Sequence, residues 1–305
     1  MSEFLPLFAN VSIPILIACL LGALYQHYKQ PDSRGLADIS LYLLSPCLIV
    51  SALTSSTQHD ASFLHILLYT AVHSGLCWAA AAAAGLLFRL PSPSRRAVEL
   101  TTIFGNSNNY GLPLLLLAYG TSGFTFGVTY VVGQILLVNT LGLYLASRST
   151  FKPQTALRQV AKVPLIYAAI IGIALYLLRV PLPGSVESGL KLVGDAYPAV
   201  VLLILGMQLR KTSWRKSWRK EIVLAVLLRI AIVPVLAWLV ILLLGLHGQE
   251  AAVLFVQSSM PAAVNAVVLM EKYNGDKDLV SITVAFTTLA SFLYLPLFIT
   301  LSSQF

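Results

Sequence analysis

The feature that most constrains this chain is a succession of ten long apolar runs separated by short polar connections. Each run has roughly 18 to 25 residues, the length that an α-helix needs to cross a hydrocarbon core of about 30 Å. Hydrophobic residues make up 57% of the 305 residues and charged residues only 10%, which excludes an ordinary soluble domain. The sequence therefore predicts an all-α polytopic membrane protein with ten transmembrane helices. The expected spans are 4–25, 35–53, 63–88, 97–119, 124–147, 163–178, 185–209, 221–246, 251–273 and 279–301.

The basic residues predict which ends of the spans face the cytoplasm. The loops after the first, third, fifth, seventh and ninth spans hold 17 of the 20 Lys and Arg residues. Because basic loops stay on the cytoplasmic side, we expect a multi-pass protein of the cell (inner) membrane with both termini outside. This placement accounts for the net charge of +8 without a nucleic-acid partner.

Two of the spans are interrupted by residues that disfavour helices. The fourth contains two glycines, three asparagines and a proline between Gly105 and Pro113, and the ninth has a milder break at 257–265. A helix surrounded by lipid could not leave backbone groups unpaired, so such breaks survive only where protein or a water-filled cavity covers them. Two broken spans, one in each half of the chain, therefore predict a binding site.

The halves of the chain are expected to be inverted repeats. A long basic connection, residues 148–162, separates five spans in residues 1–147 from five spans in residues 163–305. An odd number of spans in each half forces the halves into opposite orientations, as in many secondary transporters. The breaks agree with this division, because they fall in the fourth span of each half.

Several ordered motifs resemble the auxin efflux carrier family, which includes bacterial organic-acid carriers and the plant PIN auxin exporters. They are Ser45 to Leu53, Asn106 followed by Gly111-Leu112-Pro113, Met260-Pro261 with Asn265, Glu271 to Asp276, and Ser291 to Pro296. The resemblance implies a scaffold of spans 1, 2, 6 and 7 and a transport domain of spans 3–5 and 8–10. It also implies that spans 4 and 9 cross at their breaks, a design shared with the bile acid symporters.

The breaks supply the candidate substrate-binding residues. A buried amide must find hydrogen-bond partners, which favours Asn106 and then Asn265 as ligands. Both restarted half-helices aim their N-termini at the membrane midplane, and each carries free N–H donors and about half a positive charge. Because no Asp or Glu lies in either break, a carboxylate-bearing substrate is expected, held without a dedicated arginine. The full candidate set is Asn106, Asn108, Asn109, Tyr110, Gly111, Pro113, Ser259, Pro261 and Asn265.

Three other residues are candidates for contact with a coupling ion or proton: Asp195, His73 and Gln257. Ionisable residues within spans are functional candidates by default, and histidine titrates in the useful range. Arg229, also deep in a span, is expected to form a salt bridge between the seventh and eighth spans. Alternatively, its long side chain extends to the cytoplasmic interface.

The sequence therefore predicts a secondary transporter of small organic anions, with auxin-like carboxylates among the candidate substrates, that works by alternating access without a cofactor. No metal site and no catalytic motif is recognised, so an enzyme is not expected. The alternatives are a sodium-coupled importer of the bile acid symporter type and a membrane sensor that transports nothing. Expected partners are the organic anion, a coupling proton or sodium ion, membrane lipids and, by resemblance, a second copy in a homodimer.

Overall fold

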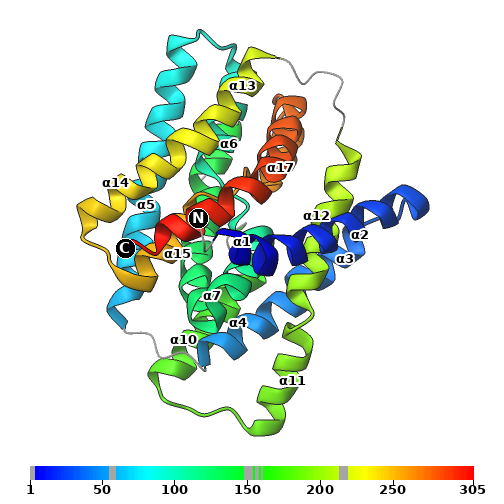
Figure 1. The fold of residues 1–305 in the computed structure, drawn as a ribbon, viewed down its shortest axis with the longest axis vertical. Coiled ribbons are helices and arrows are strands. Elements are labelled where there is room, and N and C mark those ends of the chain that lie inside the picture. The colour runs from blue at the N-terminus through cyan, green and yellow to red at the C-terminus, as the bar shows by residue number, and fades with distance from the viewer. Residues whose placement is uncertain (1–3, 55–59, 148–153, 155–157, 159–160, 213–218) are drawn as a thin grey trace.

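The computed structural model describes residues 4–54, 60–147, 154, 158, 161–212 and 219–305, which are almost entirely helical (Figure 1). Short π-helical turns join several of the helices, at Phe8–Ser12, Ser40–Leu44, Ser107–Gly111, Val138–Gly142 and Leu228–Ile232. The α-helices are α1 (Phe4–Leu7), α2 (Ile13–Lys29), α3 (Arg34–Ile39), α4 (Ser45–Thr54), α5 (Asp60–Leu87), α6 (Ser92–Ile103), α7 (Leu112–Leu137), α8 (Leu143–Ser147), α10 (Pro164–Leu177), α11 (Gly184–Gly194), α12 (Tyr197–Lys211), α13 (Lys220–Leu227), α14 (Val233–Leu244), α15 (Gly248–Ser258), α16 (Asn265–Lys272) and α17 (Lys277–Ser302).

Seven helical stretches among the described residues are long and apolar enough to cross a membrane, and the difference from ten has local causes. The stretch Ser107–Ser147 has 41 residues, about twice what one crossing needs, and it is interrupted at Gly120, where φ is 67°. The predicted sixth span is the short helix α10, and the predicted ninth is divided between α15 and α16. The arrangement is consistent with the ten predicted spans.

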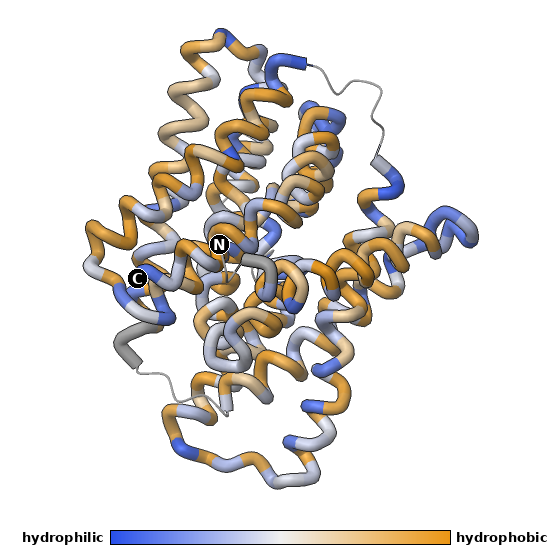
Figure 2. Tube along the Cα trace, viewed as in Figure 1, coloured by the Kyte–Doolittle hydropathy of each residue, from blue (hydrophilic) through white to orange (hydrophobic). Residues whose placement is uncertain are grey.

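The surface of the helices suits lipid rather than water. Hydrophobic residues run along most of their length, while hydrophilic residues gather mainly at the ends and in the connections (Figure 2). Large apolar side chains such as Leu64, Leu243 and Leu293 are 69%, 77% and 67% exposed. Many exposed apolar side chains of this kind would cause a water-soluble monomer to associate, whereas in a bilayer they face hydrocarbon.

The helices divide into two groups, as the resemblance implies. In the first group, α2 packs on α12, and α4 packs on both α10 and α11. The helices α5 to α7 and α13 to α17 pack mainly on one another and form the second group. The contact between α2 and α12 is very close, because a Cβ added to Gly206 would overlap the carbonyl group of Cys19. Small residues at such a crossing let membrane helices pack backbone against backbone.

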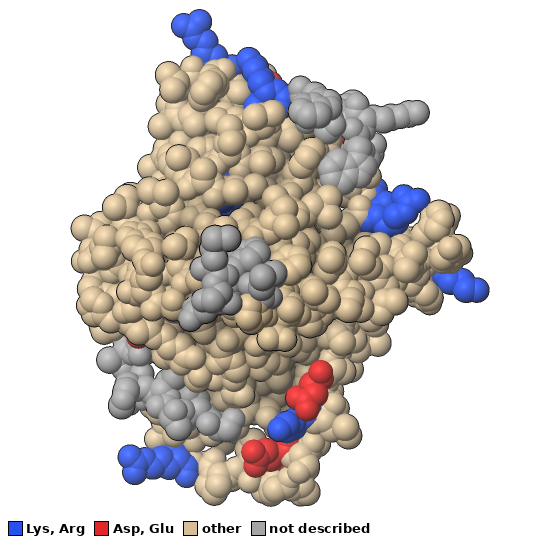
Figure 3. Space-filling model, in the orientation of Figure 1, with Lys and Arg blue, Asp and Glu red and all other residues tan. Residues whose placement is uncertain are grey.

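Both ends of the described chain lie in the same region. Helix α1 packs on α17, and the N–H of Gly248, at the start of α15, donates a hydrogen bond to the carbonyl of Phe305 at 3.1 Å. On the face drawn in Figure 3, most Lys and Arg side chains lie along the top and right edges, and most of the visible Asp and Glu atoms lie near the bottom. An uneven distribution of Lys and Arg is the pattern from which the orientation of the chain in the membrane was predicted.

A cluster of polar side chains ties three helix ends together on the side of the basic loops. Both carboxylate oxygens of Asp276 accept hydrogen bonds from Arg219, at 2.6 and 3.2 Å. Ser94, at the start of α6, donates to the same carboxylate at 3.1 Å, and Asp276 caps the first turn of α17 through the N–H of Leu279. Burial alone would raise the pKa of Asp276, but these hydrogen bonds outweigh it and leave the pKa below its ordinary value.

The lowered pKa of Asp276 predicts a pH-dependent contribution to stability. A carboxyl whose pKa is lower in the folded state stabilises that state above its unfolded pKa of about 3.9, and the contribution disappears as the pH falls through the folded pKa. We therefore expect Asp276→Asn to lower the melting temperature at neutral pH, and the difference from wild type to shrink below about pH 4.

Thermal unfolding of both proteins in detergent across this pH range measures the effect. The control is Glu271→Gln, because Glu271 pairs with Lys277 at 3.2 Å but both side chains are more than half exposed. Such a surface pair contributes little to stability. A pH-independent difference between Asp276→Asn and wild type would contradict the assignment.

Candidate functional site

The two interrupted spans meet at their breaks, as predicted. The main-chain N–H of Asn106 donates to the carbonyl of Pro261 at 2.7 Å, and the N–H of Ala263 donates to the carbonyl of Phe104 at 2.9 Å. These two bonds form one antiparallel bridge between the breaks. Backbone groups that each broken helix leaves unpaired are thereby satisfied by the other break, which is how an unwound segment is tolerated at membrane depth.

The second half of the fourth span begins earlier than its sequence predicts. The predicted break ran from Gly105 to Pro113, but a π-helical turn already begins within it at Ser107, where the N–H groups of Tyr110 and Gly111 donate to the carbonyl of Asn106. Asn106 therefore occupies the N-cap position, yet its side chain makes no capping hydrogen bond. An asparagine at an N-cap ordinarily accepts from the helix. Here the amide is left available for another partner.

A cavity of about 300 Å³ lies beside the paired breaks. On its wall, Asn106 and Gln134 are each 4% exposed, and each has one buried side-chain atom, Nδ2 and Oε1 respectively, without a partner among the described residues. A buried polar atom without a partner costs free energy, which a bound ligand can recover. The lining residues are Leu41, Phe104, Gly105, Asn106, Ser107, Asn108, Asn109, Val131, Gln134, Ile135, Val138, Asn139, Val163, Ala263, Asn265, Ala266, Val268 and Leu269.

Behind the breaks, the Arg229 guanidinium joins the C-terminal ends of α6 and α15, which are the first halves of the fourth and ninth spans. Its Nε donates to Met260 O at 2.7 Å, its Nη1 to Thr102 O at 2.8 Å, and its Nη2 to Ser258 O at 3.0 Å. These carbonyls lie at the C-terminal ends of α6 and α15, where the helix dipole is negative. Arg229 therefore caps both half-helices from the eighth span, and at 1% exposure it is completely inside the protein.

The prediction for the Arg229 side chain was wrong. It neither pairs with Asp195, which is exposed at the end of α11, nor reaches the interface. The sequence could not show that three carbonyls from two distant segments would converge on one guanidinium, which makes burial of its charge tolerable. The close approach of Arg229 to the fourth span also explains the glycine at position 105, because a Cβ there would overlap Arg229 Nη2.

Comparison with known proteins agrees with the architecture. A family model described as Membrane transport protein matches residues 9–299. The chain belongs to this family. It is the auxin efflux carrier family that the sequence motifs resemble. An uncharacterized transporter of Methanocaldococcus jannaschii is 24% identical and the alignment covers 94% of this chain and 96% of the relative. Another, of Methanothermobacter thermautotrophicus, is 25% identical, with 94% and 84% covered.

In this member of the Membrane transport protein family, four of the predicted substrate ligands line the cavity: Asn106, Asn108, Asn109 and Asn265. Asn108 is held in place, because its Oδ1 accepts from the hydroxyl of Tyr197 at 3.0 Å and its Nδ2 donates to Asn109 Oδ1 at 3.1 Å. Asn265 is exposed at the first position of α16. The crossing therefore gathers amides from both breaks around one space.

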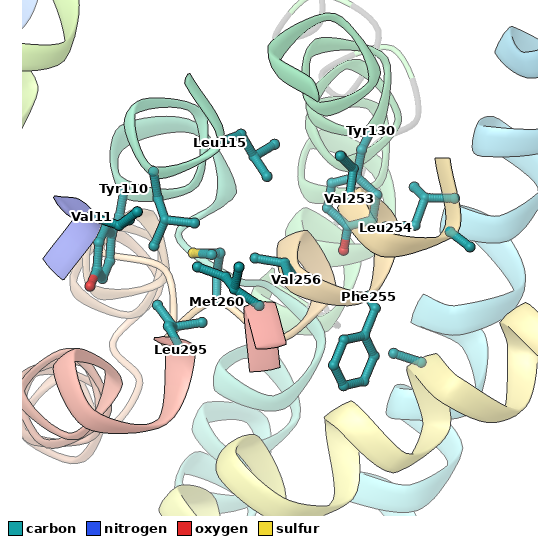
Figure 4. Close-up of a cluster of buried hydrophobic side chains, with 14 of the residues drawn as sticks. Val11, Tyr110, Leu115, Tyr130, Val253, Leu254, Phe255, Val256, Met260 and Leu295 are labelled. Atoms are coloured by element: carbon teal, nitrogen blue, oxygen red, sulfur yellow. The ribbon is translucent and has the colours of Figure 1, made fainter. Parts of the chain in front are cut away.

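The other predicted substrate ligands are buried outside the cavity lining. The Tyr110 side chain lies in the hydrophobic core beside Val11 and Leu295 (Figure 4), and its hydroxyl accepts from Ser291 at 3.3 Å. Ser259 is bonded to its own helix, at Phe255 O. The remaining three, Gly111, Pro113 and Pro261, are also buried and are not among the lining residues. Periodicity could not separate core-facing from cavity-facing positions in segments that are not regular helix.

The three candidates for ion or proton coupling do not lie together. His73 is buried in α5, with Nε2 at 3.3 Å from Val233 O. Gln257 donates from Nε2 to Ser107 O at 3.2 Å and so braces the restarted fourth span. Asp195 is exposed at the junction of α11 and α12. None of the three lines the cavity.

Two amides from the fifth span that line the cavity, Gln134 and Asn139, were not predicted from the sequence. The available signal was their polarity within an otherwise apolar run, together with a spacing of five residues. That spacing does not by itself place two side chains on the same wall of an ideal helix. A π-helical turn at Val138–Gly142 begins between them, and such turns are frequent at functional sites.

Proposed function

We propose that this transporter moves small organic anions by alternating access around the crossed breaks. The observation that carries the proposal is the cavity beside the bridge between the breaks, which is lined by Asn106, a residue whose Nδ2 has no partner in the described structure. An amide N–H donates to a carboxylate, and the N-termini of the restarted halves add further donors and positive potential at the same place.

The sign of the substrate charge follows from the charges around the cavity. Every lining residue is uncharged, while the Arg229 guanidinium lies directly behind Gly105 in the wall. The hydrogen-bond partners of Arg229 are carbonyls rather than carboxylates, so its positive charge is offset by the negative ends of α6 and α15 but by no carboxylate among them. A positive potential in a low-dielectric region favours entry of an anion and opposes entry of a cation.

Arg229 also weighs against the sodium-coupled alternative. In that alternative a cation would bind at the carbonyl ends of the broken helices. Here the carbonyls of Thr102, Ser258 and Met260 already accept from the guanidinium. We infer that the protein carries its own cation at this position and transports without sodium bound there. Asp195 stays a candidate for proton coupling, and the homodimer stays a prediction.

The conformation is proposed to be open toward the cytoplasm. The cavity wall includes Leu41, Val163 and Leu269, which lie in the halves of their spans that connect to basic loops. Those loops are expected in the cytoplasm. Alternating access would close this side and open the other by movement of one helix group against the other around the crossing.

A comparison of charged and neutral ligands tests the proposal. Purified protein is expected to be stabilised against heat by a small carboxylate but much less by its uncharged amide, because only a ligand that binds the native state raises its melting temperature. Uptake of the radiolabelled carboxylate into liposomes that contain the protein, with sodium replaced by choline, is expected to continue. Equal stabilisation by the neutral amide or by an organic cation would refute the anion carrier, and binding without any flux would support the sensor.

A further inference from the structure

Gln134 on the cavity wall is fixed by two neighbours at one end of its amide and has no partner at the other. Its Nε2 donates to Ser74 Oγ on α5 at 3.2 Å and to the hydroxyl of Tyr130, one turn earlier on α7, at 3.2 Å. Its Oε1 is buried and has no partner among the described residues. Since Nε2 is already engaged twice, the free capacity of this side chain is that of an acceptor.

Two residues that line the cavity therefore carry complementary unpartnered atoms. Asn106 Nδ2 is a donor without a partner and Gln134 Oε1 is an acceptor without a partner. A carboxylate can bind the first but not the second, because an ionised carboxylate accepts hydrogen bonds only. A ligand that satisfies both needs an acceptor, which the proposed carboxylate supplies, and a separate donor group.

A cationic donor and a second carboxylate are both unfavourable in this cavity. A cationic donor would meet the positive potential of Arg229 and the helix N-termini. A second carboxylate would bring a second negative charge into a cavity whose lining has no charged side chain. A hydroxyl both donates and accepts, so it can form a hydrogen bond with Gln134 even if a flip of the amide exchanges its oxygen and nitrogen.

The rest of the wall is apolar, with Leu41, Val131, Ile135, Val138 and Leu269 among its residues. From these observations we propose that the preferred substrate is a hydroxylated monocarboxylate with an aliphatic body. Its carboxylate binds at Asn106 and the helix N-termini, and its hydroxyl binds at Gln134. The inference rests on the proposed anion transport and specifies the substrate of the same site.

Two matched series of ligands test the inference by calorimetric titration of the purified protein. The first is propionate, lactate and methylmalonate, and the second is 4-methylpentanoate, 2-hydroxy-4-methylpentanoate and isobutylmalonate. In at least one series the hydroxy acid is expected to bind about tenfold more tightly than the plain acid, the size of one well-formed hydrogen bond. The dicarboxylate is expected to bind more weakly than the hydroxy acid.

Replacement of the amide provides the second measurement. Gln134→Leu is expected to abolish the preference for the hydroxy acid, while Gln249→Leu, which removes an exposed amide at the start of α15, keeps it. Equal affinity of wild-type protein for the hydroxy and plain acids in both series, or tightest binding of the dicarboxylate, overturns the inference and leaves anion transport standing. If no acid binds better than its neutral amide, the proposed function itself fails. The affinities of wild-type protein for the hydroxy and plain acids test the inference even if Gln134→Leu does not fold.

Discussion

Replacing Arg229 with alanine is expected to lower the melting temperature strongly and to abolish transport, and added guanidinium is expected to restore part of both. The substitution leaves the carbonyls of Thr102, Ser258 and Met260 without their donor in the interior. Each unpaired buried carbonyl costs about 1–3 kcal/mol, so several kcal/mol are lost in total, a large part of the stability of a typical domain. The vacated space has the shape of a guanidinium ion, which can reoccupy it.

Thermal unfolding in detergent with millimolar guanidinium chloride, far below denaturing concentrations, measures the rescue. Wild-type protein should show no such stabilisation. Arg229→Lys tests the geometry, because an ammonium keeps the charge but cannot reproduce the planar fork that reaches three separated carbonyls. The matched control is Arg34→Ala, since the Arg34 side chain is 90% exposed. An Arg229→Ala protein as stable as wild type, or one insensitive to guanidinium, would show that the cap is dispensable.

The substitution Asn106→Ala is expected to weaken binding of the carboxylate substrate by about 1–3 kcal/mol, roughly 5- to 150-fold, with little change in melting temperature. The reason is that Nδ2 of Asn106 has no partner in the described structure, so its removal breaks no hydrogen bond of that atom in the free protein. The cost appears only when the substrate is bound. Asn106→Asp should weaken binding further, because a negative charge would then face an anion.

Asn139 offers a control of the same residue type in the same cavity. Its Nδ2 already donates to Ile135 O on its own helix at 2.9 Å, so Asn139→Ala should have a much smaller effect on affinity. Titration of each purified variant with the best carboxylate, and a thermal melt without ligand, separate binding from folding. Similar losses of affinity in the two variants would show that Asn106 is no more than one part of the cavity wall.

The fold could be predicted to a large extent because the bilayer leaves few solutions. Apolar runs of bilayer length must be helices, and residues such as Gly105 and Pro113 must interrupt them. The prediction that the interrupted fourth and ninth spans cross was confirmed, since their breaks share an antiparallel bridge. The inverted repeat stays a prediction with which the packing is consistent, and the side of the membrane on which each terminus lies stays a prediction.

The site could be predicted only in part, since the sequence shows which residues are polar but not which way they point. Asn106, predicted to bind substrate because an asparagine in a broken helix lacks regular partners, lines the cavity. Tyr110, four residues later, was assigned to the same site and lies in the core, because a π-helical turn changes the direction of each side chain.

The sequence by itself thus determined that the protein spans a membrane, that two of its spans are broken, and that the breaks contain amides without carboxylates. These follow from local chemistry, because each depends on neighbouring residues and on the absence of water in the bilayer. Only the tertiary structure decided that Arg229 occupies the carbonyl ends of both breaks and that Gln134 faces the same cavity as Asn106. Those contacts join residues more than twenty-five positions apart, and they depend on how the helices pack rather than on any pattern within one helix.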